Sequence, residues 1–174
     1  DEPRYARFVF CFDNGYHLAF DCPRKLARIR YIDDLKAYLQ EKGLGEDAQR
    51  ISETDFLRLS EGRNGTVKGF LMNQRYLAGV GNLYADEICY QARVHPGSRT
   101  GNIPEAVRRA LYRRMQEIFA FAVEQNAHYR RYPEDWLWKW RETGRPGPNG
   151  NGQVQKIQVA GRTTYFVEGW QKKY

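Results

Sequence analysis

The chain has 174 residues, of which 41% are hydrophobic and 14% aromatic, and it carries 28 Lys and Arg against 21 Asp and Glu. This composition supports a buried core and excludes an intrinsically disordered chain. No apolar stretch approaches the ~20 residues that cross a bilayer, and the first residues lack a secretory core, so we expect no membrane contact and no secretion. Three scattered cysteines predict reduced thiols rather than a disulfide framework: Cys11, Cys22 and Cys89.

The positive charge is concentrated in the second half of the chain. Residues 1–92 hold 13 basic and 14 acidic side chains, whereas residues 93–174 hold 15 basic and 7 acidic ones. A basic half beside a neutral half indicates a polyanionic partner, most often nucleic acid. A solvated basic surface would give the same asymmetry, so the charge alone leaves both interpretations open.

The first 33 residues are predicted to form strands. Residues 7–12 and 16–20 are rich in β-formers, and the Asp-Asn-Gly turn at 13–15 predicts a hairpin between them. A third run, residues 26–32, alternates apolar and basic side chains and is predicted to be another strand. Three strands with one apolar face need a covering layer, so this region is expected to be the end of a larger sheet.

Residues 34–142 have a helical pattern. Ser52 and Thr66 are predicted helix caps, and Asn82 is predicted to cap the helix that follows the two glycines. The longest helix is expected to bury one apolar stripe, and a separate short helix from 133 is expected to hold three tryptophans, Trp136, Trp138 and Trp140. The expected helices are 34–44, 56–60, 67–74, 82–93, 104–126 and a short one from 133.

The last 32 residues are predicted to be a glycine-rich loop followed by a hairpin. Residues 143–152 have a loop composition, and the strand-like runs 153–159 and 162–167 are joined by Ala160-Gly161. The expected organisation therefore has three parts: residues 1–33, 34–142 and 143–174.

The segment 77–87 is the strongest local signal. Gly79 and Gly81 allow a sharp turn with close approach of another chain, and the helix beginning at Asn82 would present free N–H groups that suit a phosphate. An ordinary connection between two helices would show the same Gly-x-Gly-Asn spacing.

The surroundings of this turn carry a resemblance to a known family. Residues 66–96 closely resemble the helix–two-turn–helix of the formamidopyrimidine-DNA glycosylase and endonuclease VIII family, with matches at Lys68, the turn, Tyr84, Glu87 and His95-Pro96. The resemblance implies an α+β fold: part of the N-terminal β-sandwich, a helical DNA-binding domain and a C-terminal finger hairpin. It also implies that four residues bind DNA phosphates: Lys68, Gly81, Asn82 and Arg162.

A second match is the turn at residues 21–27, which resembles the loop that the family inserts where the damaged nucleotide is flipped out. By position Arg24 would face the orphaned base, with Lys25 beside it, and Leu26 would replace the lost stacking. A solvated basic turn is the other interpretation. Three residues depart from the family pattern: Cys22, Leu26 and Ala27.

The third match is the C-terminal hairpin, residues 162–171, which resembles the family's zinc finger with Val167 and Trp170 at two cysteine positions. No Cys or His follows His128, so we expect no metal and a zincless finger. Strand pairing is expected to hold it, together with packing of Trp170, Tyr165 or Phe166. Arg162 keeps the place of the finger arginine, whose fork matches phosphate oxygens.

The family's chemistry begins at an N-terminal Pro-Glu, and residue 1 of this chain aligns with the late part of the family's first domain. We therefore expect no catalytic residue in this chain and no cofactor. One hypothesis is the DNA-binding portion of a repair glycosylase and AP lyase for oxidised bases, with oxidised purines favoured. The alternative is a non-catalytic damaged-DNA-binding module. Either would be a monomer on double-stranded DNA with a damaged or abasic site, in the nucleoid-containing cytoplasm or the nucleus.

Overall fold

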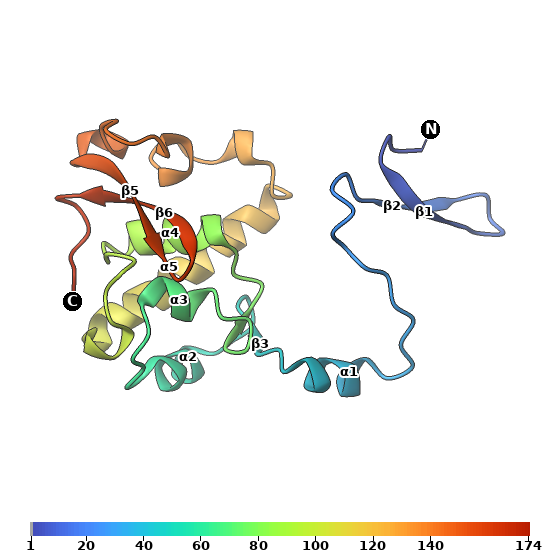
Figure 1. The fold of residues 1–174 in the computed structure, drawn as a ribbon, viewed down its shortest axis with the longest axis horizontal. Coiled ribbons are helices and arrows are strands. Elements are labelled where there is room, and N and C mark those ends of the chain that lie inside the picture. Colours follow the sequence, from blue (N-terminus) through green and yellow to red (C-terminus); the bar gives the residue numbers. More distant parts are fainter. Residues whose placement is uncertain (1) are drawn as a thin grey trace. The chain divides into compact units, whose positions relative to one another are not determined.

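The structure is a computed structural model that describes residues 2–174. It divides into two compact units, one ending at Leu39 and the other running from Gln40 to Tyr174. Both contain short sheets, and the second holds most of the helices, so the predicted α+β class is confirmed (Figure 1).

The N-terminal unit contains the predicted hairpin. Strand β1, Ala6–Cys11, pairs antiparallel with β2, His17–Asp21. The turn closes through the N–H of Phe12 on the carbonyl of Tyr16 at 2.9 Å, and Gly15 has φ 81°, a conformation that favours glycine.

The predicted third strand, residues 26–32, was wrong. That segment is irregular, and among the described residues β1 and β2 pair only with each other. Lys25 has φ 55° in the turn that precedes it, and its N–H bonds to the carbonyl of Cys22. A run of β-formers becomes a strand only where a neighbouring edge accepts its hydrogen bonds, and none is present here.

The helices form largely where the capping residues predict. α1 is Leu35–Lys42, α2 is Glu53–Ser60, α3 is Val67–Leu71, α4 is Asn82–Gln91 and α5 is Glu105–Glu124. Ser52 accepts from the N–H of Asp55, and Thr66 accepts from the N–H of Gly69, which confirms both caps. The cap of α4 is a correction: it is Gly81, which leaves Asn82 as the first helical residue with its side chain free for another contact.

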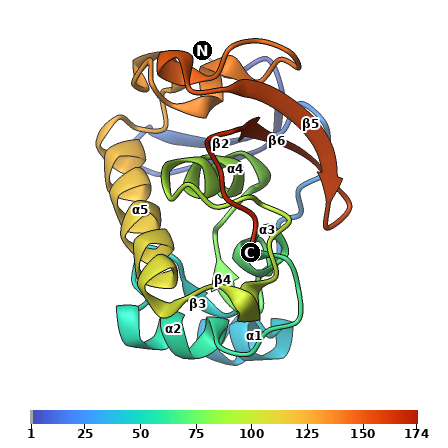
Figure 2. The same ribbon diagram turned by 90° about the vertical axis from the view of Figure 1, so that its left-hand side faces the viewer.

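Helix α5 covers one side of the main core with the predicted stripe. Its buried residues share the helical period, pack with α2 and α4, and belong to the main apolar core. Figure 2 shows α4 between α5 and the C-terminal hairpin, and α4 contacts both. The buried stripe is Leu111, Met115, Ile118, Phe119 and Ala122.

The C-terminal hairpin consists of β5, Gln153–Val159, and β6, Arg162–Glu168. Its centre is Val154 and Val167, which are fully buried with Leu137 and Tyr90 in a small apolar cluster. Val167, which stands at a cysteine position of the family's finger, is therefore a core residue of this hairpin. Trp170 and Tyr165 only border this cluster, whereas Phe166 packs on the ring of His95 at 4.4 Å between centroids.

Short elements connect these parts. β3, Glu46–Asp47, pairs parallel with β4, Leu77–Ala78, just before the glycine turn. The predicted tryptophan helix is a 3-10 turn, η3, Leu137–Trp140. The other 3-10 turns are η1, Thr100–Asn102, η2, Tyr129–Arg131, and η4, Pro148–Gly150. Within residues 2–174, no helix combines the length and apolarity that crossing a bilayer requires.

Candidate nucleic-acid interface

The glycine turn presents the N-terminus of α4. Gly79 has φ 97°, and Gly81 caps the helix with no side-chain hydrogen bond, so the first N–H groups of α4 lack a capping side chain. The amide of Gln74 fixes the turn: its Nε2 donates to the carbonyl of Val80 at 3.0 Å, and its Oε1 accepts from the N–H of Gly79 at 2.9 Å. Sequence reasoning missed Gln74, because a lone glutamine after a helix carries no distinctive signal.

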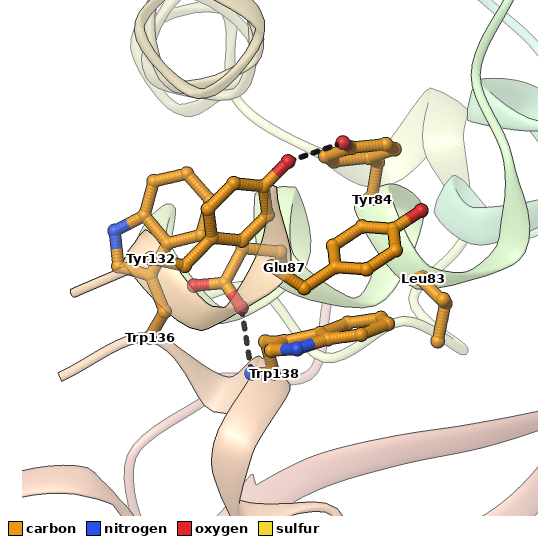
Figure 3. A pocket seen from close by; sticks show the side chains of 7 residues that line it. Leu83, Tyr84, Glu87, Tyr132, Trp136 and Trp138 are labelled. Carbon is orange, nitrogen blue, oxygen red and sulfur yellow. Dashed lines mark hydrogen bonds between the residues drawn. The ribbon is translucent and has the colours of Figure 1, made fainter. Parts of the chain in front are cut away.

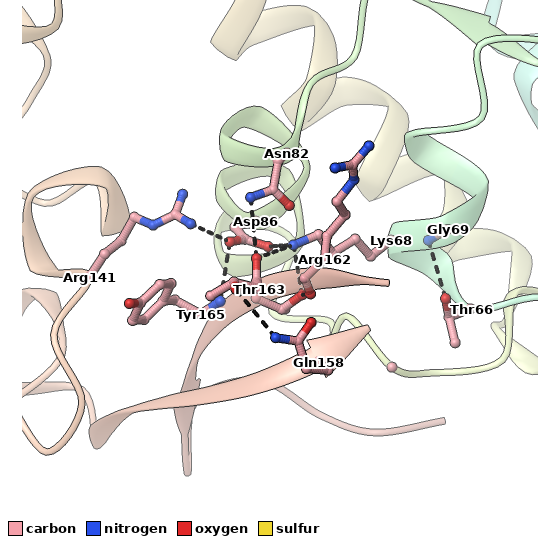
Figure 4. Close-up of polar contacts among 12 residues, drawn as sticks. Thr66, Lys68, Gly69, Asn82, Asp86, Arg141, Gln158, Arg162, Thr163 and Tyr165 are labelled. Atoms are coloured by element: carbon pink, nitrogen blue, oxygen red, sulfur yellow. Dashed lines mark hydrogen bonds and ion pairs between the residues drawn. The ribbon is translucent and has the colours of Figure 1, made fainter. Parts of the chain in front are cut away.

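Asn82 and Arg162 are far apart in the sequence, but the fold brings the start of α4 next to the start of β6. The Nδ2 of Asn82 donates to the carbonyl of Thr163 at 3.2 Å, one residue after Arg162 (Figure 4). Arg162 is exposed, and within residues 2–174 no carboxylate forms an ion pair with it. A helix N-terminus and an unpaired guanidinium on one surface are suited to a phosphate.

Lys68 lies beneath this surface rather than on it, which corrects the expectation of a direct phosphate contact. Its side chain is 0% exposed, and its Nζ donates to Asp86 Oδ1 at 2.6 Å, Thr164 Oγ1 at 2.7 Å and the Thr163 carbonyl at 3.2 Å. These contacts use all three ammonium donors. The physical reason is that the hairpin folds over the lysine and supplies partners that satisfy it.

Asp86 connects the elements around Lys68. Besides Lys68, its carboxylate pairs with Arg141 Nη2 at 3.2 Å and accepts from the N–H of Tyr165 at 3.1 Å. Burial lowers the pKa of the Lys68 ammonium and raises that of the Asp86 carboxyl, and their direct contact counters both shifts. This network joins α3, α4 and β6. Sequence reasoning missed Asp86, Thr164 and Arg141 because nothing in their spacing predicts that they meet.

The loop with Arg24, Lys25 and Leu26 belongs to the N-terminal unit. All three residues are exposed, Leu26 at 75%. The carbonyl of Cys22 accepts from Arg7 Nε at 3.2 Å and from the N–H of Lys25, which shapes the turn. A protruding basic and apolar tip has the chemistry of a duplex-entering loop, and its role stays a prediction.

An aromatic cluster lies along the same helix as Asn82. Tyr84 and Tyr132 share a hydrogen bond of 2.7 Å, and Glu87 accepts from the N–H of Trp138 at 3.1 Å and from Gln91 at 2.9 Å (Figure 3). Burial raises the pKa of Glu87 to about 7. The cavity between the rings is only about 10 Å³, too small for a base. These rings therefore pack the fold.

The side chains that bind metals in proteins lie apart in the part of the chain that the structure describes. Across residues 2–174, no three His, Cys, Asp or Glu side chains converge as a metal site would require. The centre of the C-terminal hairpin holds the apolar cluster of Val154, Val167, Leu137 and Tyr90, which contains no metal ligand.

Comparisons with known proteins agree with this geometry. A model described as the formamidopyrimidine-DNA glycosylase H2TH domain matches residues 44–132. A formamidopyrimidine-DNA glycosylase of Arabidopsis thaliana is 30% identical over 175 residues, which cover 98% of this chain and 45% of that protein. One of Streptococcus pyogenes is 28% identical, covering 98% of this chain and 67% of that protein. The chain thus spans about half the length of the plant relative.

Two solved structures are similar in fold. The Lactococcus lactis Fpg in complex with DNA containing an abasic site has a TM-score of 0.70 and 26% identity, covering 81% of this chain and 56% of that one. The MutM (Fpg) protein of Thermus thermophilus has a TM-score of 0.75 and 26% identity, covering 100% of this chain and 71% of that one.

Proposed function

The chain belongs to the formamidopyrimidine-DNA glycosylase family, and from that premise we propose that it is the DNA-binding portion of a base-excision-repair glycosylase and AP lyase. The proposed substrate is duplex DNA with an oxidised base, oxidised purines being favoured, or with an abasic site. The protein would act as a monomer.

The observation that carries the proposal is the junction between Asn82 and the residue next to Arg162. A phosphate at this junction would accept from the exposed guanidinium of Arg162, from the amide of Asn82 and from the free N–H groups that follow Gly81. Contacts from a helix and from a hairpin to the DNA phosphates fix the register of the protein on the duplex, and they do not depend on the base sequence.

Arg24 and Leu26 complete the proposal on the N-terminal unit. We assign Arg24 to hydrogen bonding with the orphaned base and Leu26 to the space left by the flipped nucleotide, with Lys25 on the backbone. The support is chemical: the tip is exposed, cationic and apolar together. Enzymes that act on a base must extrude it and then stabilise the gap.

Binding to a short duplex with a stable abasic analogue tests the proposal. Asn82→Ala and Arg162→Ala should each weaken binding about 10-fold or more, because each removes a hydrogen bond to a charged group. Arg113→Ala, an exposed arginine of α5, is the matched control and should leave the affinity within about 2-fold. Equal affinity in all three variants would remove the phosphate site from Asn82 and Arg162.

Borohydride trapping on damaged duplex separates catalysis from binding. A covalent adduct indicates a Schiff base with the sugar and supports lyase activity. Tight binding with no adduct, for the natural full-length protein, favours the alternative of a non-catalytic damaged-DNA-binding module. Comparing duplexes with an oxidised purine and an oxidised pyrimidine in the same assay tests the substrate preference.

A further inference from the structure

Beneath the Asn82–Arg162 surface one buried carboxylate pairs with a buried lysine and a largely buried arginine. The side chains of Lys68, Asp86 and Arg141 are 0%, 1% and 14% exposed, and Asp86 pairs with both cations. Within residues 2–174 no second carboxylate forms an ion pair with Lys68 or Arg141. This triad therefore holds one more positive than negative charge in a largely buried position, an arrangement that a nearby anion would stabilise.

Arg141 is the less satisfied of the two cations. Its Nη2 pairs with Asp86, and its guanidinium lies 4.8 Å from the centroid of the Tyr165 ring. Its Nη1 is buried and has no hydrogen-bond partner in the protein. Figure 4 shows Arg141, Asn82 and Arg162 grouped around Asp86 and the start of β6. In this view Arg141 lies on the opposite side of Asp86 from Arg162, so an anion at the Asn82–Arg162 surface would face Arg141 across Asn82 and Asp86.

Other ionisable groups near the triad supply little opposing charge at mildly acidic pH. Glu87 follows Asp86 on α4 and interacts electrostatically with Arg141, but burial raises the pKa of Glu87 to about 7. Burial also raises the pKa of the Cys89 thiol, which stays neutral. At about pH 6, a unit below its pKa, Glu87 is mostly protonated and cancels little of the excess positive charge of the triad.

We propose that a DNA phosphate seated between Asn82 and Arg162 is the missing counter-ion of the Lys68–Asp86–Arg141 triad. The inference rests on the proposed DNA binding and adds to it a buried, phosphate-recognising charge at Arg141. Because a buried charge is screened by salt less than an exposed one, Arg141 attracts the phosphate although little of it reaches the surface. Arg141 acts by charge and does not touch the reacting atoms.

The test compares Arg141→Gln with Arg141→Lys in binding to the abasic-analogue duplex at about pH 6, a unit below the Glu87 pKa. We expect Arg141→Gln to weaken binding about 10-fold and to make the plot of log affinity against log salt less steep, by up to about 0.9, the value for one neutralised phosphate. Arg141→Lys keeps the charge and should keep the slope. Arg93→Gln is the matched control, since Arg93 also stacks on an aromatic ring, that of Trp170, 3.7 Å from its centroid, but at the other end of α4.

A purely structural role of Arg141 gives a different pattern. Loosening of the hairpin would weaken both Arg141 variants and leave the salt slope unchanged, and that result overturns the inference. A slope lost in Arg141→Gln and retained in Arg141→Lys and Arg93→Gln supports it. If the wild-type chain does not bind the duplex, both the proposed function and this inference are wrong. If the wild-type chain binds and Arg141→Gln has the same salt slope as wild type, only the inference is wrong.

A measurement on the wild-type protein covers the case in which a variant does not fold. The guanidinium signals of Arg141 in a ¹⁵N NMR spectrum should shift when the abasic duplex is added, while those of Arg93 should stay in place. Arg141 signals that do not move at saturating duplex contradict the proposed counter-ion.

Discussion

The chain contains two antiparallel hairpins, β1–β2 and β5–β6, with short turns and very different surroundings. In β1–β2 three large apolar side chains are about half exposed: Phe8 at 49%, Phe10 at 45% and Leu18 at 59%. In β5–β6 Val154, Val167 and Thr164 are 0% exposed. Alternating β-formers and a good turn are common to both, so these features do not explain the burial of the second hairpin.

The difference is the layer behind each hairpin. β6 packs on α4, and the buried Lys68 reaches up from α3 to the carbonyl of Thr163 and the hydroxyl of Thr164. Within its own compact unit, β1–β2 has no helix packed on it. An isolated two-stranded hairpin is marginally stable in water, and a covering layer supplies the apolar burial that it lacks. The C-terminal hairpin is therefore stabilised by tertiary packing on the helical core.

Hydrogen exchange should show the largest contrast. We expect the ladder amides of β5–β6 to exchange at least about 10³-fold more slowly than those of β1–β2, because opening the packed hairpin requires unfolding of the main core. Amide-resolved exchange of this chain measures both hairpins in one sample. Similar protection would mean that the exposed hairpin has support from another part of the chain.

Removing the buried anion should destabilise the anchored hairpin strongly. Asp86→Ala leaves two buried cations without a partner and is expected to cost about 3–5 kcal/mol of unfolding free energy, measured by urea denaturation. The matched control is Glu117→Ala, which breaks the exposed Arg114–Glu117 pair of α5 and should change stability by no more than about 0.5 kcal/mol. A loss below about 1 kcal/mol for Asp86→Ala would show that water reaches the site.

The raised pKa of Glu87, which accepts a hydrogen bond from the N–H of Trp138, predicts that the free energy of unfolding depends on pH. Its pKa is raised from 4.5 to about 7, so between these values the unfolded chain ionises while the folded one stays protonated. Wild-type stability should therefore fall as pH rises through this window and level off above it. Glu87→Gln cannot ionise, and Gln91 can reverse its amide to keep the hydrogen bonds.

The corresponding measurement is the unfolding free energy of both proteins across pH. The stability of Glu87→Gln relative to wild type should increase by about 3 kcal/mol between pH 4.5 and pH 8. A parallel pair of curves would show that the folded-state pKa of Glu87 is close to its ordinary value.

Truncation in the two hairpins should give the smallest effects, and unequal ones. Val167→Ala removes two buried methylene equivalents beside Leu137 and should cost about 2 kcal/mol. Leu18→Ala, in the exposed hairpin, should cost less than about 0.5 kcal/mol. Thermal unfolding of the two variants provides the comparison, and equal losses would contradict the proposed difference in support.

The candidate site was only partly predictable from the sequence. The two glycines, the caps at Ser52 and Thr66 and the candidate phosphate residues Asn82 and Arg162 were recognised from local chemistry and from the family resemblance. The burial of Lys68 was not, because a lysine in a helix gives the same local pattern whether a hairpin covers it or water does. The role of Gln74 as the clamp of the glycine turn was missed for a similar reason.

The sequence by itself determined the local structure: the hairpin turns at Gly15 and Gly161, the apolar stripe of α5 and the lack of cysteine ligands in the last part of the chain. Tertiary structure decided what depends on partners distant in the chain, namely the irregular course of residues 26–32 and the meeting of Lys68, Asp86 and Arg141. Turns and helical periodicity follow from the sterics of neighbouring residues, whereas strand pairing and the burial of charge depend on which surfaces the whole fold brings together.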